Sequence, residues 1–252
     1  EERRLLATFV WDYGQADTTW AVPSSWKQDG TDTDPDYGEP GFSVGPSLRA
    51  ANVPFVFHAD FVERTPLAQA EWLLFTALFV DRVDRAQPLF DRVAARYEEL
   101  AEIGRAQTER PRVLLGAPYR GVWWVPGGKS FPARLIEDAG GEYLWADHPS
   151  DTGVPLSLEA VFERADEADL WLHPSDFGSL AELRAADPRV ARLPVVERDR
   201  VWSNDARLNA HGGNDYWETG LVRPDLVLAD LLRILHPEAL PAHEPVFHRR
   251  LR

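Results

Sequence analysis

Two segments of the chain combine aromatic and polar residue types that suit ligand binding. The first, residues 118–130, holds a tyrosine, two adjacent tryptophans, a Gly-Gly pair and a serine. The second, residues 204–218, ends in the run Asn-Asp-Tyr-Trp-Glu. Tryptophan and tyrosine provide flat, rigid apolar area at low entropic cost, which suits large planar or cyclic ligands. We therefore expect a ligand to be contacted by Tyr119, Arg120, Trp123, Trp124, Ser130, Asn214, Tyr216, Trp217 and Glu218.

Each of these aromatic residues also has a purely structural interpretation. Either Trp123 or Trp124, taken alone, is as readily explained by packing into the core. Trp217 follows Gly212-Gly213 and a capping residue, Asn214, so a capped helix start with an inward tryptophan explains it slightly better. The stronger indication of a ligand-binding site is that both segments, and not one alone, are aromatic.

Patterns for catalysis are weak by comparison. The chain has 41 acidic residues, so a pair suited to general acid–base chemistry carries little information. His58, His173 and His211 could converge at strand ends as metal ligands, yet no HxH or HExxH spacing is present. GxSxG, P-loop and GxGxxG motifs are also absent. The sequence therefore predicts no catalytic residues, no resident metal and no cofactor.

Composition excludes several classes of partner and chemistry. The 252 residues include no cysteine, so neither disulfides nor thiolate chemistry is available. A net charge of −14 repels nucleic acid and anionic lipid. The chain also contains no run of 18 apolar residues, which a membrane-spanning helix requires.

Hydrophobic periodicity indicates an α/β protein. A buried strand is expected at residues 53–58, after a loop-like tract at residues 14–46. Thr65-Pro66 begins a long helix that runs to about Ala106, and Pro88 is expected to kink or restart it. Strands then alternate with helices, which favours a parallel sheet covered on both faces, and the tail 241–252 looks peripheral. The strands are expected at 112–117, 142–145, 168–172 and 195–201, and the helices at 130–139, 157–165, 180–186 and 224–235.

This order of elements predicts where a ligand lies. In open α/β sheets, ligands bind beside the carboxyl ends of the strands. The loops that follow the expected strands are 58–64, 118–129, 147–155, 173–178 and 204–217. Both aromatic segments belong to this set.

Several segments, in order, resemble the class III solute-binding proteins of ABC importers, particularly the iron-complex and cobalamin branch. The helix entry Thr65-Pro-Leu-Ala-Gln-Ala-Glu-Trp-Leu-Leu-Phe75 is similar to the family pattern TPLGRAEWIKF. The resemblance spans residues 55 to 240 or so. It continues through Arg112-Val-Leu-Leu-Gly116, Val122-Trp-Trp-Val-Pro-Gly-Gly-Lys-Ser130, Asp138-Ala-Gly-Gly-Glu-Tyr-Leu-Trp145, Ser157-Leu-Glu159, Ala168-Asp-Leu-Trp171, Gly212-Gly-Asn-Asp-Tyr-Trp-Glu218 and Arg223-Pro-Asp-Leu-Val-Leu-Ala-Asp-Leu-Leu-Arg-Ile-Leu-His-Pro237.

The resemblance implies an α/β fold of two Rossmann-like lobes with parallel sheets, joined by a single long α-helix. The first lobe is short or incomplete at residues 1–64, the linker helix covers 65–108, and the second lobe covers 109–252. The implied function is a receptor that captures a metal chelate, such as a ferric siderophore, haem or corrinoid, between its lobes. It then delivers this ligand to an ABC permease and ATPase complex.

The resemblance also implies a place in the cell and a docking mode. The receptor would be periplasmic or at the cell surface, exported by a removed signal peptide and held by a lipid-bearing cysteine outside this chain. It would be a monomer, and acidic residues would meet arginines of the permease. Glu63 and Glu159 are the candidate docking acids.

Two other functions remain open from the sequence. A two-lobed α/β metal-dependent hydrolase or transferase would use the same cleft and bring the three histidines together with acids. An adhesion or sensor module would use the binding lobe without a transporter partner.

Overall fold

The computed structural model describes residues 8–10, 52, 55–119, 121–175 and 177–252. The chain divides into two compact units, residues 1–59 and residues 60–252. In the first unit, β1 (Thr8–Val10) pairs in parallel with β2 (Phe55–Phe57), which confirms the strand expected at 53–58. The loop-like tract at 14–46 lies outside the described residues.

The second unit is built on a five-stranded sheet in the order β10-β9-β8-β3-β6. β6 (Glu142–Tyr143), β3 (Arg112–Leu115), β8 (Leu170–Leu172) and β9 (Val201–Ser203) run parallel, and β10 (Arg249–Arg250) closes the edge antiparallel. β3 and β8 are buried on both faces, as their continuous apolar runs predict.

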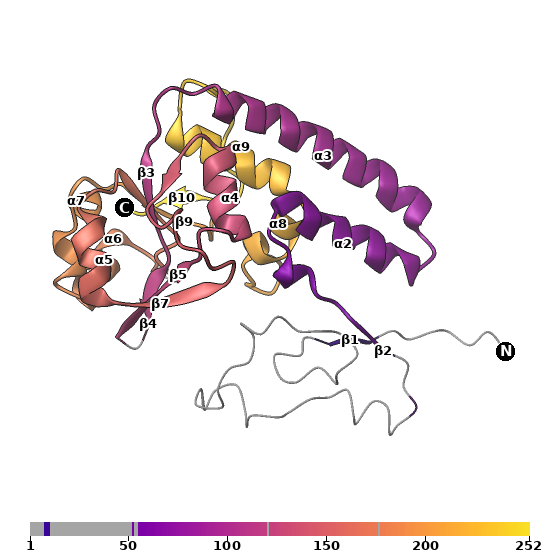
Figure 1. Ribbon diagram of the computed structural model, residues 1–252, viewed down its shortest axis with the longest axis horizontal. Coiled ribbons are helices and arrows are strands. Elements are labelled where there is room, and N and C mark those ends of the chain that lie inside the picture. The colour runs from indigo at the N-terminus through magenta and orange to yellow at the C-terminus, as the bar shows by residue number, and fades with distance from the viewer. Residues whose placement is uncertain (1–7, 11–51, 53–54, 120, 176) are drawn as a thin grey trace. The chain divides into compact units, whose positions relative to one another are not determined.

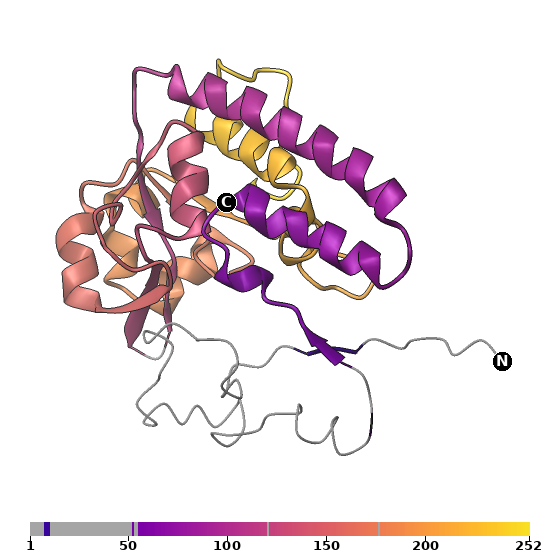
Figure 2. The same ribbon diagram turned by 45° about the vertical axis from the view of Figure 1, so that its right-hand side comes forward.

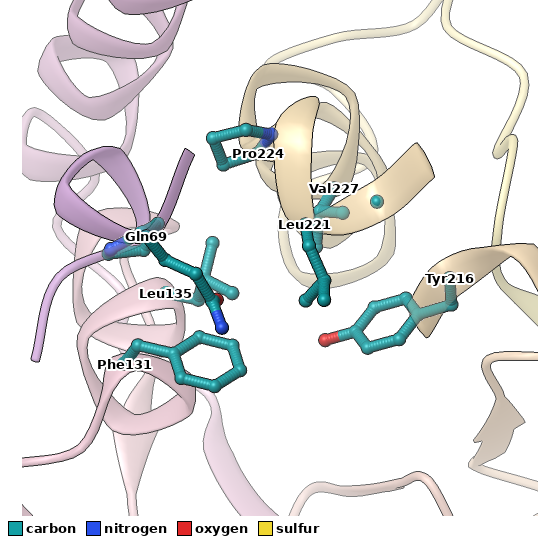
Figure 3. Close-up of a pocket in the computed structure, with 9 residues that line it drawn as sticks. Gln69, Phe131, Leu135, Tyr216, Leu221, Pro224 and Val227 are labelled. Atoms are coloured by element: carbon teal, nitrogen blue, oxygen red, sulfur yellow. The ribbon is translucent and has the colours of Figure 1, made fainter. Parts of the chain in front are cut away.

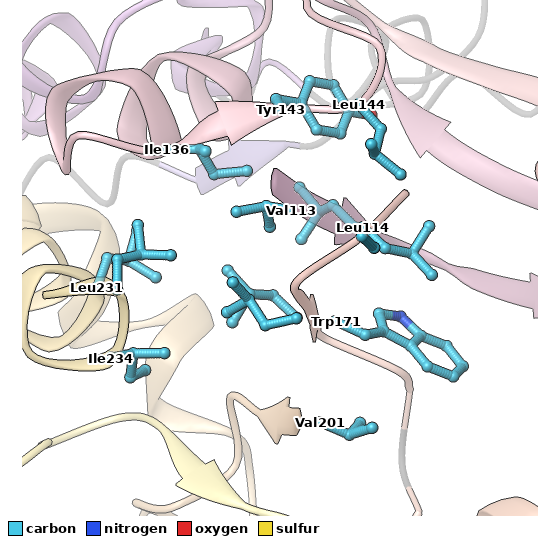
Figure 4. Close-up of a cluster of buried hydrophobic side chains, with 14 of the residues drawn as sticks. Val113, Leu114, Ile136, Tyr143, Leu144, Trp171, Val201, Leu231 and Ile234 are labelled. Carbon is cyan, nitrogen blue, oxygen red and sulfur yellow. The ribbon is translucent and has the colours of Figure 1, made fainter. Parts of the chain in front are cut away.

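Helices cover both faces of this sheet (Figures 1 and 2). One face carries α3 (Val83–Arg105), α4 (Phe131–Asp138) and α9 (Pro224–Leu235), and the other carries α5 (Leu158–Ala165), α6 (Leu180–Ala186) and α7 (Pro194–Glu197). Figure 4 shows the core between these layers, with Ile136, Leu231 and Ile234 on one side of Val113 and Trp171 on the other.

A second, antiparallel sheet lies beyond the end of β3. It comprises β4 (Ala117–Tyr119), β5 (Val122–Pro126) and β7 (Gly153–Ser157), with β5 in the centre. Short helical turns complete the unit: η2 (Asp60–Val62), η3 (Val190–Arg192), η4 (Asp215–Trp217) and α8 (Thr219–Val222).

The single long helix expected from Thr65 to about Ala106 is instead two helices, α2 (Pro66–Leu78) and α3, which pack against each other. The Thr65 hydroxyl accepts from the amide of Ala68, which confirms the expected N-cap. The break falls where Asp81 adopts φ 52, a left-handed conformation that ends a helix. Pro88, where the break was expected, lies inside α3.

Two further expectations were wrong. Residues 194–197 form α7, with Pro194 at its first position, and the strand expected at 195–201 begins only at Val201. The tail is not peripheral, because it supplies β10 and buries Phe247 and Leu251 completely. No helix among the described residues is long and apolar enough to cross a membrane.

Candidate ligand-binding site

Three loops leave the carboxyl ends of neighbouring parallel strands. They follow β3, β8 and β9 and span residues 116–130, 173–179 and 204–218; together they are named the carboxyl edge. The two aromatic segments singled out in the sequence are the first and third of these loops. The topology therefore confirms that both segments leave the same edge of one sheet.

The first loop begins with a tight glycine turn. Gly116 has φ +89, and a β-carbon there would lie 2.0 Å from the carbonyl oxygen of Trp124. Only glycine fits this position, where the chain turns out of β3 into the β4–β5 hairpin.

Alternation along β5 sends the two tryptophans to opposite faces. Trp123 is fully buried, with its ring 5.1 Å from that of Trp171 and 6.3 Å from that of Phe162. Trp124 is 43% exposed, and Tyr119 on the neighbouring strand is 51% exposed. The expectation that both tryptophans face a ligand needs correction, because Trp123 as placed belongs to the core.

The Gly-Gly-Lys-Ser run at the end of this loop is structural. The amides of Gly127, Gly128 and Lys129 donate to carbonyl oxygens of the 148–152 segment. The Ser130 hydroxyl is buried and donates to the Gly127 carbonyl oxygen at 2.7 Å. Ser130 therefore presents no surface to a ligand, contrary to expectation. Arg120 lies outside the described residues.

The third loop is held by asparagine side chains. Asn209 accepts from the amides of His211 and Gly213 and donates to the Glu218 carboxylate at 2.7 Å. The Asn214 side chain accepts from the amide of Tyr216 and caps η4, as expected for a capping residue. Glu218 is exposed, and its position is fixed by Asn209.

Tyr216 is the centre of an aromatic cluster at this edge. Its ring contacts those of Trp217 at 4.8 Å, His173 at 5.0 Å, His248 at 5.6 Å and Phe247 at 6.1 Å. Burial raises the pKa of Tyr216 above its ordinary value, so the hydroxyl stays protonated. Trp217, next along η4, is 53% exposed and so offers its ring to the outside.

Two small pockets adjoin Tyr216. The first, of about 240 Å³, lies among α2, α4, η4, α8 and α9, and in Figure 3 the Tyr216 hydroxyl points into it. The second, of about 200 Å³, is lined by Leu115, Leu172 and His173 at the strand ends, and it shares Leu135 and Tyr216 with the first. Both linings are mainly apolar. Both volumes include space that is open to solvent, and the enclosed space is about 10 Å³ in each pocket, which is room for a water molecule rather than for a ligand.

A chain of polar side chains runs behind Tyr216. The Nε2 atoms of His173 and His248 are 2.9 Å apart, and Nδ1 of His248 lies 3.0 Å from Oδ2 of Asp230. His173 directly follows β8 and has φ 56, and Asp230 lies in the middle of α9 and is fully buried. We name these three residues the relay.

Asp230 anchors the tail through five hydrogen bonds. Besides His248 Nδ1, it accepts from His243 and from three successive backbone amides, those of residues 246–248. Burial alone would raise the pKa of Asp230. The hydrogen bonds and charge of His248, together with His243, outweigh burial and hold the pKa below its ordinary value. Asp230 is therefore a carboxylate at neutral pH.

His173 is kept neutral by its surroundings. Burial lowers its pKa well below the ordinary value, and the neighbouring His248 lowers it further. Sequence reasoning considered His173 only as a partner of His58 and His211. The true partner, His248, is 75 residues away in the chain and lay in the segment judged peripheral.

The enzyme alternative requires His173 and His211, with His58, to converge with acids. His211 is exposed in the third loop, and Nε2 of His173 is taken up by its contact with His248. Within the part of the chain that the structure describes, no group of three or more His, Asp or Glu side chains is placed to hold a metal ion.

The two candidate docking acids differ in their surroundings. Glu63 is half-buried and accepts a hydrogen bond from the Trp72 indole at 2.9 Å. Glu159 is exposed in the first turn of α5, where a negative charge favours the helix dipole.

A model of the periplasmic binding protein family matches residues 47–208, which is more than half of the chain. The chain belongs to the periplasmic binding protein family. This confirms the resemblance to class III solute-binding proteins, and members of this family bind solutes rather than catalyse reactions.

Solved structures share the fold with this binding protein. The periplasmic haem-binding protein RhuT of Roseiflexus sp. RS-1, in its apo form, has 24% identity and a TM-score of 0.60, over 77% of this chain and 71% of that one. Haem-bound IsdE of S. aureus has 16% identity and a TM-score of 0.54, over 77% and 72%. These likenesses confirm the class III α/β fold.

A curated relative is an uncharacterized lipoprotein of Methanocaldococcus jannaschii. It is 26% identical over 213 residues, which is 83% of this chain and 49% of the relative. The chain therefore spans about half the length of the curated relative it matches.

Proposed function

We propose that this periplasmic binding protein is the receptor of an ABC importer and that its ligand is a planar or cyclic metal chelate: a haem, a ferric siderophore or a corrinoid. The observation that carries the proposal is the exposure of aromatic rings on two loops of the carboxyl edge. Trp124 and Tyr119 lie on the first loop, and Trp217 lies on the third.

The chemistry of the edge suits such a ligand. The pockets around Tyr216 are lined mainly by leucine, proline, phenylalanine and valine, with few polar groups. Apolar walls with a small number of polar groups bury the flat faces of a large ligand and orient its edge. Rings such as Trp124 and Trp217 add contact area with little loss of rotamer entropy.

The relatives support the class of ligand and the place in the cell. RhuT is a haem-binding protein, and IsdE was solved with haem. The lipoprotein relative supports an exported, lipid-anchored protein. We propose a periplasmic or cell-surface location, with Glu159 and Glu63 as docking acids for the permease.

The division of labour within the chain is part of the same proposal. Residues 1–64 and 109–252 act as lobes, and residues 65–108 act as the linker, with the 23-residue α3 as its stiff element. A linker made of two helices that pack against each other is stiff, and we expect it to permit small lobe movements rather than a wide hinge closure.

The proposal is tested by titrating the purified chain with hemin, a ferric hydroxamate siderophore and cyanocobalamin while tryptophan fluorescence is recorded. We expect at least one chelate to bind at micromolar concentration or below. The double variant Trp124→Ala/Trp217→Ala should weaken binding at least about tenfold, which corresponds to about 1.4 kcal/mol.

The matched control is Leu89→Ala, which removes an exposed apolar side chain from α3, away from the carboxyl edge. It should leave the affinity unchanged. If none of the three chelates binds, the proposed ligand class is refuted. If the double variant binds with unchanged affinity, the proposed site at Trp124 and Trp217 is refuted.

A further inference from the structure

The relay fixes which ring nitrogens carry protons. A hydrogen bond between the two Nε2 atoms needs one donor and one acceptor. The Asp230 carboxylate only accepts, so His248 donates to it through Nδ1–H. A neutral His248 then has a bare Nε2, which accepts from Nε2–H of His173.

This arrangement decides the state of the remaining nitrogen. When His173 carries its proton on Nε2, its Nδ1 is an unprotonated acceptor. In the part of the chain that the structure describes, Nδ1 of His173 has no hydrogen-bond partner. His173 is half-buried and lines the second pocket, beside Tyr216 and the ends of β3 and β8.

One added proton changes the polarity without breaking the contact. We assign the proton to His248, because Asp230 lies against His248, whereas among the described residues no carboxylate pairs with His173. Imidazolium His248 donates through Nε2–H as well, so Nε2 of His173 becomes the acceptor. Neutral His173 must then carry its own proton on Nδ1, which turns that atom into a donor.

The other charged groups nearby are already paired. On the third loop, Arg207 lies over the Phe247 ring and pairs with Asp215. On β10, Arg249 pairs with Asp205. The titratable and charged groups around the relay on the elements packed against it are Asp230, His243, Tyr216, Arg207, Asp215, Asp205 and Arg249.

We propose that the relay Asp230–His248–His173 is a one-proton switch that sets the hydrogen-bond polarity of a ligand subsite at Nδ1 of His173. With His248 neutral, the subsite accepts from a hydroxyl or amine of a ligand. With His248 protonated, it donates to an anionic oxygen such as a carboxylate.

The switch deepens the proposed function by giving the carboxyl edge a pH-dependent preference for one class of ligand group. That consequence rests on the proposed function, whereas the proton positions within the relay do not. The two therefore fail separately: a chain that binds no chelate can still show the switch.

Nitrogen-15 NMR of the histidine side chains tests the proton positions in the ligand-free chain. At pH 8, we expect His248 protonated on Nδ1 alone and His173 on Nε2 alone. On titration to pH 5, His248 should become doubly protonated while the His173 proton moves from Nε2 to Nδ1. The switch is refuted if Nδ1 of His173 stays bare throughout, or if His173 itself becomes the imidazolium.

The anionic subsite is probed with sodium propionate at millimolar concentration. Propionate should shift the His173 signals at pH 5.5 at least about threefold more than at pH 8. Equal shifts at both pH values, or none at pH 5.5, would refute the change in preference.

Variants separate the relay from general pH effects. His248→Gln removes the titrating ring, so the position of the His173 proton should no longer depend on pH. His211→Gln, an exposed histidine outside the relay, should leave the titration unchanged. The wild-type spectrum carries the test by itself if His248→Gln does not fold.

Discussion

Trp123 and Trp124 have neighbouring backbones and opposite environments. Trp123 fills the space between the β4–β5–β7 sheet and the main sheet, where it meets Trp171. Trp124 stands on the outer face, opposite Pro155 of β7. Trp123 therefore serves folding, and its neighbour Trp124 is the one proposed to serve binding.

Alanine substitution at these two positions should give opposite patterns. Trp123→Ala empties a fully buried site and should lower the free energy of unfolding by about 3–5 kcal/mol. Trp124→Ala removes a half-exposed ring and should change it by about 0.5 kcal/mol, while weakening ligand binding. Urea denaturation measures both values, and equal losses of stability would contradict the assignment.

The low pKa of His173 has a consequence for stability as well as for the relay. In the unfolded chain, this histidine titrates near its ordinary value of about 6.5. Below that pH, this histidine is protonated in the unfolded state but stays neutral in the native state. The free energy of unfolding must therefore fall as the pH is lowered.

We expect the free energy of unfolding to decrease from pH 7 to pH 5, with His173 contributing up to about 1.4 kcal/mol per pH unit. Chemical denaturation at fixed pH values measures the slope. His173→Phe should flatten it, and the exposed control His211→Gln should not. A slope that is the same in wild type and His173→Phe would show that other groups cause the pH dependence.

At the scale of elements, the helix pair α2–α3 and the tail tie the second unit together. α3 packs on both α4 and α9. Its Tyr97 donates to the buried carboxylate of Asp138 on α4, and its Gly104 lies against the end of that helix. The tail is fastened to α9 through Asp230. These contacts hold in place the elements from which the carboxyl edge begins.

Gly104→Ala tests the contact between α3 and α4. A β-carbon at this position would lie 2.0 Å from the backbone carbonyl oxygen of Asp138, which cannot swing away. Overpacking of this kind costs about 1–3 kcal/mol, although glycine to alanine inside a helix ordinarily stabilises by up to about 1 kcal/mol. Thermal and urea denaturation should show a destabilised variant; a stabilised one would contradict the close approach.

The sequence predicted elements well where the signals were local. Thr65-Pro66 marked the start of α2, and the apolar runs marked β3 and β8. The break at Asp81 was missed because aspartate adopts positive φ without a distinctive pattern. At Pro194-Val-Val, the β-branched residues favoured a strand, but proline at the first position of a helical turn prevailed.

The loops of the candidate site were predicted more accurately than its side chains, because Trp123 and Ser130 are buried. The carboxyl-end rule placed both aromatic loops correctly, because it depends only on strand order. Which tryptophan points outward depends on the register of β5 against its neighbours, and that register is not encoded locally. The relay joins residues 173, 230 and 248 because the tail packs against α9. No spacing pattern in the sequence predicts such a long-range contact.

At the scale of the whole molecule, the family match covers residues 47–208, and the candidate site uses elements on both sides of its end. The loop that carries Tyr216 and Trp217, helix α9 and the tail all lie beyond residue 208. Ligand preference in this chain is therefore expected to depend strongly on the region after the matched segment.

The most direct test of the account locates the bound ligand. Hydrogen–deuterium exchange of the chain is measured with and without the chelate that binds best in the fluorescence titration. Binding at the carboxyl edge predicts slower exchange in loops 116–130, 173–179 and 204–218. It predicts unchanged exchange in α5, α6 and α7, which cover one face of the sheet. Protection that spares all three loops would contradict the account.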